Sequence, residues 1–330
     1  MKSHRIVVAA AVGTLAALGT LTGETGAQAQ SWPERPIKLI VPTGPGAATD
    51  VMARLLAEDV GRRIGGTMVV ENRAGASGIP AHQAAATAEP DGYTFLFSNT
   101  SGLASNIVTF KKLPYDPTAD FTSVAIVANL APQMISVNAA VPAKTLGELI
   151  AYAKANVGKV SYGADATAGA AVFAGRLVNK RSGAEIAEVA YRSAAQMVQD
   201  AASGVLPVLV SSIAVASPFL QTGQLRAIAV TSSKRFPSMP DVQAVNETLA
   251  GVQLDGWFVV VAPKGVAAPV VQKLNAAIGE YLKLPATQKR LIDIGLATEG
   301  SGTPESTAKF IAEQQQAWRV LANELGIQAQ

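Results

Sequence analysis

The feature that most constrains the fold is the regular alternation of strand-like and helix-like segments. The apolar run 36–41 (PIKLIV) predicts a buried strand, and residues 49–63 carry apolar side chains at helical spacing. The run 67–71, the Ala-rich segment 79–88 and the run 93–98 continue as strand, helix and strand. This β-α-β-α-β order predicts parallel strands joined by right-handed crossovers, so we expect an α/β fold.

Two long apolar segments predict that the chain crosses between two lobes. Residues 121–137 are long for one strand and contain Pro132, which suits a segment that passes from one lobe into the other. Residues 256–262 (GWFVVVA) predict a strong strand and the return crossing. Two crossings make a hinge, because a few residues at element ends can absorb the change in backbone angles. The expected lobes are 30–129 plus 253–330, and 130–252. Further helices are expected at 145–156, 170–181, 194–202, 268–284 and 304–325, and further strands at 160–163, 187–191, 205–210 and 225–231.

The first 29 residues have the three parts of a secretory signal peptide. Lys2 and Arg5 form a basic start, residues 6–21 form an apolar run, and 27–29 (AQA) form a small-residue cleavage site. The run contains Gly and Thr and is shorter than the roughly 20 strongly apolar residues of a membrane span. We therefore expect cleavage after Ala29 and export of the mature chain to the periplasm.

Composition argues against several classes of catalytic and metal site. The chain has no Cys, which excludes disulfides, thiolate metal sites and cysteine nucleophiles. Of the two His, His4 lies in the expected signal peptide, so only His82 remains, and we expect it on the surface of its helix or partly buried. One His gives no His pair for a metal, and no G-x-S-x-G elbow is present. We expect no catalytic residue, no metal and no cofactor. The net charge of +3 is spread along the chain, which predicts no nucleic-acid partner.

The most informative segment is 41–50 (VPTGPGAATD), which joins a strand to a helix. Gly44 and Gly46 let the backbone approach a ligand, and the following helix directs free N–H groups and its positive dipole end at the same point. The alternative is an ordinary turn with Thr49 as N-cap and Asp50 in the first helical turn. The candidate ligand-binding residues of this first loop are Thr43, Gly44, Gly46, Ala47 and Thr49.

The segment 160–172 repeats this plan in the other expected lobe, as a strand, a loop of small residues and a helix. Arg54-Leu55 and Arg176-Leu177 even occupy matching positions in the two helices. Two such loops facing across a cleft would grip one carboxylate from both sides through backbone amides. The alternative for this second loop is a plain connection. Its candidate residues are Ala164, Asp165, Ala166, Thr167, Ala168 and Gly169.

Hydroxyl side chains also follow the third expected strand. Ser98, Thr100 and Ser101 lie at the strand end, where open α/β sheets place their ligands. Their hydroxyls can donate to a carboxylate or hold bridging waters, and the alternative is that they cap a helix. Arg192 is a candidate partner for a second carboxylate, with a plain surface charge as its alternative.

An enzyme remains as the alternative function. Residues 44–49 (GPGAAT) are similar to the G-x-G-x-x-G dinucleotide fingerprint, and Glu71 ends the next strand, where a ribose-binding acid would lie. This predicts an exported dinucleotide-binding oxidoreductase. Thr49 in place of the third Gly, the stiffness of Pro45 and the exported destination count against it. A structural or adhesive protein is a third, minor class, because the chain has no repeats and only 5% aromatic residues.

Several short motifs occur in order along nearly the whole mature chain. The first are 32–42 (WPERPIKLIVP), 45–46 (PG) and 49–50 (TD). The others are 70–75 (VENRAG), 90–94 (PDGYT), 112–117 (KLPYDP), 225–231 (LRAIAVT), 256–258 (GWF) and 269–277 (PVVQKLNAA). Together they resemble Bug-type receptors, the periplasmic solute-binding proteins of tripartite tricarboxylate transporters.

The resemblance implies a type II periplasmic binding protein fold, a hinged Venus flytrap that closes on a small carboxylate. The ligand would be a di- or tricarboxylate, an aromatic carboxylate or an amino acid. In the family, the loops matching 43–49 and 164–169 hold the ligand carboxylate through backbone groups and waters, and the segment matching 98–101 lines the cleft. Loops matching 191–193 and 211–212 help to set ligand choice, which adds Tyr191, Arg192 and Ser211 to the candidates. The implied partners are membrane subunits of a transporter or a sensor protein, and we expect a monomer.

The sequence departs from the family pattern around the expected ligand. Ala47 and Ala48 replace some of the usual Gly residues, and Asp165 places an acid beside the expected carboxylate. Residues 188–191 read EVAY where the family has His-Val-Pro-Tyr, and Pro207 takes a commonly acidic position. These changes leave open whether the far end of the ligand is a second carboxylate or aromatic, and what Asp165 does.

Overall fold

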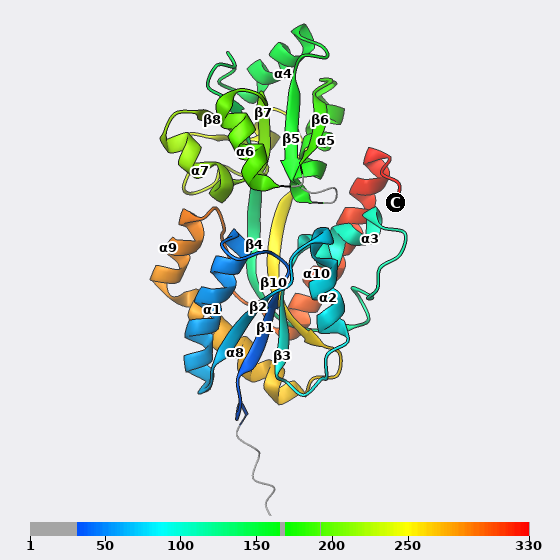
Figure 1. The fold of residues 1–330 in the computed structure, drawn as a ribbon, viewed down its shortest axis with the longest axis vertical. Coiled ribbons are helices and arrows are strands. Elements are labelled where there is room, and N and C mark those ends of the chain that lie inside the picture. Colours follow the sequence, from blue (N-terminus) through cyan, green and yellow to red (C-terminus); the bar gives the residue numbers. More distant parts are fainter. Residues whose placement is uncertain (1–31, 166–168, 192, 330) are drawn as a thin grey trace, which may run out of the picture. The chain divides into compact units, whose positions relative to one another are not determined.

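A ten-stranded sheet runs through the part of the chain that the structure describes, which is residues 32–165, 169–191 and 193–329 of a computed structural model (Figure 1). Its strand order is β2-β1-β3-β10-β4-β7-β5-β6; off this path, β8 pairs with β4, and β9 pairs with β8. Residues from Pro33 onward form one compact unit. Both parallel and antiparallel pairs are present, so the sheet is mixed.

The N-terminal β-α-β-α-β unit is confirmed. β1 (Ile37–Val41) pairs in parallel with β2 (Met68–Asn72) on one side and with β3 (Thr94–Asn99) on the other. The connecting helices are α1 (Ala48–Ile64) and α2 (Ile79–Ala86). Buried apolar residues fill β1 and one side of α1, as their spacing in the sequence predicted.

β4 (Phe121–Asn138) is a single strand of 18 residues that belongs to both parts of the sheet (Figure 1). Residues 121–132 pair antiparallel with β10 (Asp255–Pro263), and residues 133–138 pair with β7 and β8. Pro132 lies opposite Asp255, the first residue of β10, so the missing N–H of the proline falls at the end of that ladder. The proline therefore marks the change of pairing partners and does not interrupt the strand.

The remaining strands form the other part of the sheet. β5 (Ser161–Asp165) pairs in parallel with β6 (Ala187–Tyr191) and with β7 (Val208–Ser212). β8 (Leu225–Val230) pairs antiparallel with β4 and in parallel with the short β9 (Gln243–Ala244). The helices here are α4 (Leu146–Ala155), α5 (Ala170–Ser182), α6 (Ala194–Ser203) and α7 (Ile213–Gln221).

Two helices that contain or begin with a proline were not predicted from the sequence. α7 contains Pro218, and α9 (Pro285–Asp293) begins at a proline directly after α8 (Ala268–Lys283) ends. Proline is favoured at the first position of a helix, where its missing N–H has no partner in any case. The strand predicted at 205–210 was also displaced, since β7 begins at Val208.

The chain after β3 also contains elements that no pattern predicted. A π-helix, η2 (Ser101–Ser105), runs into the short α3 (Asn106–Thr109). The last helix, α10 (Pro304–Leu325), matches its predicted bounds. No helix among the described residues is long and apolar enough to cross a membrane.

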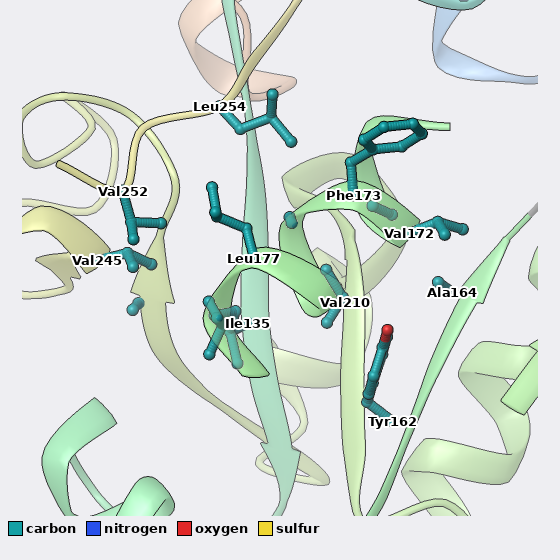
Figure 2. Close-up of a cluster of buried hydrophobic side chains, with 14 of the residues drawn as sticks. Ile135, Tyr162, Ala164, Val172, Phe173, Leu177, Val210, Val245, Val252 and Leu254 are labelled. Atoms are coloured by element: carbon teal, nitrogen blue, oxygen red, sulfur yellow. The ribbon is translucent and has the colours of Figure 1, made fainter. Parts of the chain in front are cut away.

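A large apolar cluster fixes α5 against the sheet (Figure 2). Figure 2 shows Phe173 and Leu177 of α5 among Ile135 of β4, Val210 of β7 and Leu254. Phe173 also packs edge-on against Trp318 of α10, with ring centroids 4.6 Å apart. The N-terminus of α5, which follows the second loop, is therefore held in place by core packing.

Candidate functional site

The strand register places the first loop and the hydroxyl segment at one edge of the sheet. β1 and β3 are parallel neighbours, with Ile40 opposite Leu96. The loop that follows Val41 and the segment that follows Asn99 therefore leave the sheet at the same edge. This is the carboxyl edge, where α/β sheets bind ligands.

The register places the other candidates at the carboxyl edge of the second group of strands. Asp165 at the end of β5 lies opposite Tyr191 at the end of β6. β7 runs parallel to β5 and ends at Ser211 and Ser212. The second loop, the 191–193 segment and the 211–212 segment therefore begin at a shared edge.

The two crossing strands bring these two carboxyl edges toward each other. Ser212, at the end of β7, lies opposite Gln133 of β4. Asn99, at the end of β3, lies opposite Phe258 of β10, which in turn lies opposite Ala128 of β4. β3 thus ends opposite the middle of β10, and β7 ends opposite the middle of β4, next to Pro132, which faces the first residue of β10. The two carboxyl edges that carry the predicted residues are therefore joined through β4 and β10.

In the first loop, Asp50 fixes the backbone from within α1. Its carboxylate accepts hydrogen bonds from the Gly46 amide at 2.9 Å, from Arg54 Nε at 3.0 Å and from Asn72 Nδ2 at 2.7 Å. Asn72 Nδ2 also donates to the Thr43 carbonyl at 2.9 Å, so β2 braces the same loop. Burial acts to raise the pKa of Asp50, but these hydrogen bonds outweigh it and leave the pKa below its usual value. The carboxylate is thus occupied by the protein itself.

The same loop leaves donors unused. The residue before α1 is Ala47, whose methyl side chain cannot cap the helix, so the alternative with Thr49 as N-cap is wrong. The first N–H groups of a helix have no partner within it, and here no side chain of the N-cap residue takes their place. Thr43 Oγ1 is buried and has no hydrogen-bond partner among the described residues. The helix N–H groups and the Thr43 hydroxyl could each donate a hydrogen bond to an anion.

Ser98 is positioned differently from the other candidates, because its hydroxyl donates a hydrogen bond to the ring of His82. His82 is fully buried and not on the helix surface, so the sequence prediction for it was wrong. Its Nδ1 lies 2.8 Å from the Gly78 carbonyl, which can only accept, so Nδ1 carries the hydrogen. Nε2, 2.7 Å from Ser98 Oγ, is therefore the acceptor, and Ser98 donates to it. Burial lowers the pKa of His82 to about 4, and the bond to Gly78 opposes this shift.

Thr100 and Ser101 lie where β3 passes into the π-helix. Thr100 Oγ1 accepts a hydrogen bond of 2.8 Å from the backbone N–H of Trp257 in β10, and Ser101 is partly exposed as the first residue of η2. The next residue, Gly102, packs on the His82 ring, since a Cβ there would lie 1.8 Å from Nε2. π-helical turns are frequent at functional sites, and no sequence pattern announced this one.

The second loop is described in part. Ala164 is buried, Asp165 ends β5, and Gly169 is the N-cap of α5, while Ala166, Thr167, Ala168 and Arg192 lie outside the described residues. As in α1, an N-cap without a polar side chain precedes the helix. The two loops therefore share the same plan at their helix starts.

An ion pair fixes α5 behind the second loop. Arg176 donates to both oxygens of Glu188 at 2.7 and 2.8 Å, and the buried Tyr162 donates to Glu188 at 2.7 Å. Arg54 and Arg176, which occupy matching positions in the sequence, thus both bind a carboxylate that braces their helix. Glu188 was not among the candidate residues, although the departure EVAY at 188–191 marked its position in the sequence.

The last two candidates use their hydroxyls within the protein. Tyr191 Oη donates to Asp200 at 2.8 Å, and the buried Ser211 Oγ donates to the Ser212 carbonyl at 3.1 Å. Ser193 instead caps α6, accepting from the Gln196 amide. No group of three or more His, Asp or Glu side chains within the described ranges could hold a metal ion.

Comparison with known proteins gives a consistent result. The model of the tripartite tricarboxylate transporter family receptor, TctC, matches residues 52–327. BugT of Bordetella pertussis is 34% identical over 322 residues, which is 94% of this chain and 97% of BugT. The structure of R. palustris Rpa4515 with adipate is 30% identical, covers 91% of this chain and 100% of that protein, and has a TM-score of 0.85. MatC from Rhodopseudomonas palustris, with bound malate, is 28% identical, covers 88% and 99%, and has a TM-score of 0.77.

Proposed function

The chain belongs to the TctC family of tripartite tricarboxylate transporter receptors, and we propose that it captures a small carboxylate between its first and second loops. The family consists of periplasmic solute-binding receptors, and the two-lobed binding protein fold is that of its solved relatives. Relatives with bound adipate and malate support a di- or tricarboxylate as the ligand class. Aromatic carboxylates and amino acids are the other ligand classes to be tested.

The proposed mode of binding uses backbone amides at two helix starts and no fixed cation. The N-terminus of α1 follows the first loop, and the N-terminus of α5 follows the second. Each helix start offers free N–H groups and a positive dipole end, so together they can hold one carboxylate. Thr43, Gly44, Gly46, Ala47 and Thr49 would form one side, and residues 164–169 would form the other. Asp50 already takes the Gly46 amide, Pro45 has no N–H, and the Ala47 amide donates to the Gly44 carbonyl at 3.4 Å. The donors proposed for the ligand are therefore the N–H groups of the first turn of α1.

The buried hydroxyl of Thr43 is the observation that carries this proposal. A buried hydroxyl without a partner costs about 1–3 kcal/mol, and a native protein keeps one where a ligand or water completes it. Thr43 belongs to the first loop, five residues before α1 begins at Ala48. A ligand carboxylate that accepts from this hydroxyl would satisfy it on binding.

The test is a pair of variants measured against a panel of carboxylic acids. Thermal unfolding of residues 30–330 with adipate, malate, citrate, benzoate, nicotinate and glutamate identifies the ligand, and calorimetry gives its Kd. Thr43→Val keeps the side-chain volume and removes the donor, so the Kd should weaken about 10- to 100-fold. Ser136→Ala is the matched control, because Ser136 Oγ in β4 is also buried without a partner among the described residues. It should leave the Kd unchanged.

The outcomes separate the proposal from its alternatives. An unchanged Kd for Thr43→Val would place the carboxylate elsewhere. Thr167→Trp should obstruct the second loop and abolish the ligand-induced rise in melting temperature. NADH fluorescence that changes on addition of the protein, or turnover of any acid in the panel, would instead favour the exported dinucleotide-binding oxidoreductase.

Arg192, Tyr191 and Ser211 are proposed to set ligand choice at the far end of the site. Arg192 would pair with a second carboxylate, and Asp165 would bond a protonated or hydroxyl-bearing part of the ligand. Asp165 is the last residue of β5, and Arg192 directly follows Tyr191, the last residue of β6, in the sequence. Asp165 and Tyr191 lie opposite each other in the sheet. Arg192→Ala should weaken a dicarboxylate much more than a monocarboxylate of the same length, if this assignment is right.

Ligand binding would favour closure of the lobes 30–129 plus 253–330 and 130–252 about β4 and β10. A ligand can shift that equilibrium only by its differential affinity for the closed state, which comes from bridging both loops. The closed monomer would then be recognised by membrane subunits of a tripartite tricarboxylate transporter or by a sensor protein. We also propose a signal peptide cleaved after Ala29, which N-terminal sequencing of the exported protein tests.

A further inference from the structure

A pocket of about 320 Å³ lies apart from both loops, between α5, α10 and the segment 251–257 that leads into β10. Its wall includes Leu177 and Leu254, which Figure 2 shows in the apolar cluster beside α5. None of the residues proposed for carboxylate binding lines it. Its volume is in the range of small-molecule sites, so it can hold a ligand of a few heavy atoms.

Asp255 gives this pocket an uncompensated negative charge. Its Oδ1 is buried and has no hydrogen-bond partner among the described residues, and its Oδ2 accepts from Gln253 Nε2 at 3.2 Å. Burial raises the pKa of Asp255 to about 6, while the bond from Gln253 opposes the shift. Above that pH, Asp255 is a largely buried carboxylate with one oxygen that accepts no hydrogen bond from the described residues. This arrangement destabilises the protein unless a bound cation or donor compensates the charge.

Among the described residues that line the pocket, Arg181 is the one cationic side chain, and it is already paired. Arg181 lies 2.7 Å from Glu324, which also lines the pocket. Two carboxylates and one guanidinium leave a formal charge of −1 when Asp255 is ionised. The pocket therefore favours a cation.

Two of the three Trp residues of the chain line the same pocket. These are Trp257 and Trp318, both almost completely buried. Trp257 Nε1 donates to Gln314 at 3.1 Å, which fixes the indole in place. Indole rings attract cations through their π electrons and also pack against alkyl groups. The Asp255 carboxylate and the two indoles are therefore suited to bind an organic ammonium ion.

We propose that this pocket binds a small primary ammonium ion, at a site separate from the carboxylate site. The ammonium group pairs with the Asp255 carboxylate, and its alkyl part lies against the indoles. The site adjoins the hydroxyl segment, since the backbone N–H of Trp257 is the donor to Thr100. Asn129 of β4 also lines the pocket, so both crossing strands contribute to it.

Tryptophan fluorescence of residues 30–330 tests this directly, with ethylammonium chloride as the probe and sodium chloride at equal ionic strength as the reference. Ethylammonium should give a saturable change in emission and a rise in melting temperature that sodium does not give. Asp255→Asn should weaken the apparent Kd at least tenfold. Glu313→Gln, which removes an exposed carboxylate of α10 outside the pocket, should leave it unchanged.

A second variant protects the test against misfolding. Ala317 lies at the exposed rim of the pocket on α10, so Ala317→Phe should fill the space and abolish the response while the fold is retained. Equal responses to sodium and ethylammonium, or a full response in Asp255→Asn or Ala317→Phe, would overturn the proposal. No carboxylate is present in this titration, so its result is independent of the proposed receptor function.

Discussion

His82 should make the stability of this protein fall as the pH drops below neutral. In the folded chain its pKa is about 4, against 6.5 for an exposed histidine, because the ring is fully buried. The unfolded chain therefore takes up a proton near pH 6.5, whereas the folded chain resists until about pH 4. The contribution is fully present above pH 6.5 and is lost as the pH falls from 6.5 to 4.

The size of this effect follows from the difference between the two pKa values. At about 1.36 kcal/mol per unit, a difference between 6.5 and about 4 corresponds to roughly 3 kcal/mol in the free energy of unfolding, and about 2 kcal/mol is already lost at pH 5. A protonated ring would also lose its role as acceptor for Ser98, because both nitrogens would then donate.

Urea denaturation at pH 7.5 and 5.0 measures this in the wild type and in His82→Gln. The uncharged glutamine cannot titrate, so the wild type should lose about 2 kcal/mol more than the variant between these two pH values. Other titrating groups are common to both proteins and cancel in this difference. Equal losses in the two proteins would refute a buried, neutral His82.

Three further predictions concern groups outside the ligand loops. Burial raises the pKa of Asp255 to about 6 from 3.8, so the ionised carboxylate destabilises the fold fully above pH 6 and not below pH 3.8. Asp255→Asn should therefore raise the free energy of unfolding at pH 8 by up to about 3 kcal/mol. The same urea titrations should show no gain at pH 4. Gly102→Ala should lower the melting temperature strongly, since its Cβ would lie 1.8 Å from His82 Nε2, whereas Gly44→Ala, with nothing within 4 Å, should change it little. Glu188→Gln should lower the free energy of unfolding by about 1–2 kcal/mol, because Arg176 and Tyr162 both lose a charged acceptor and solvent screens part of that loss. Differential scanning calorimetry measures this change.

The order of elements was largely predictable because each depends on local patterns. Strand β6 and helix α10 match the predicted bounds, and most others lie within three residues of them. Helices α7, which contains Pro218, and α9, which begins at Pro285, were not predicted, because the same residue type can end one helix and begin another. The single strand β4 could not be foreseen, because a proline is tolerated there only where the pairing partner changes.

The chemistry at the loops was harder to predict than their positions. Glycine spacing and the strand-to-helix pattern marked the first loop, but nothing local shows that Asp50 turns back to bind the Gly46 amide. The burial of His82 depends on Gly78, Ser98 and Gly102, which come from separate elements. Asp255 was not singled out in the sequence, and its unpaired oxygen becomes visible only in the folded chain, where Asp255 lines a pocket with residues of α5 and α10.

The most direct test is a crystal structure of residues 30–330 with whichever carboxylate gives the largest rise in melting temperature. We expect one ligand carboxylate to lie within hydrogen-bonding distance of Thr43 Oγ1, of the amides before α1 and of those before α5, directly or through waters. A bound molecule that leaves both helix starts empty, and reaches its acid group with a lysine or arginine alone, would contradict this account.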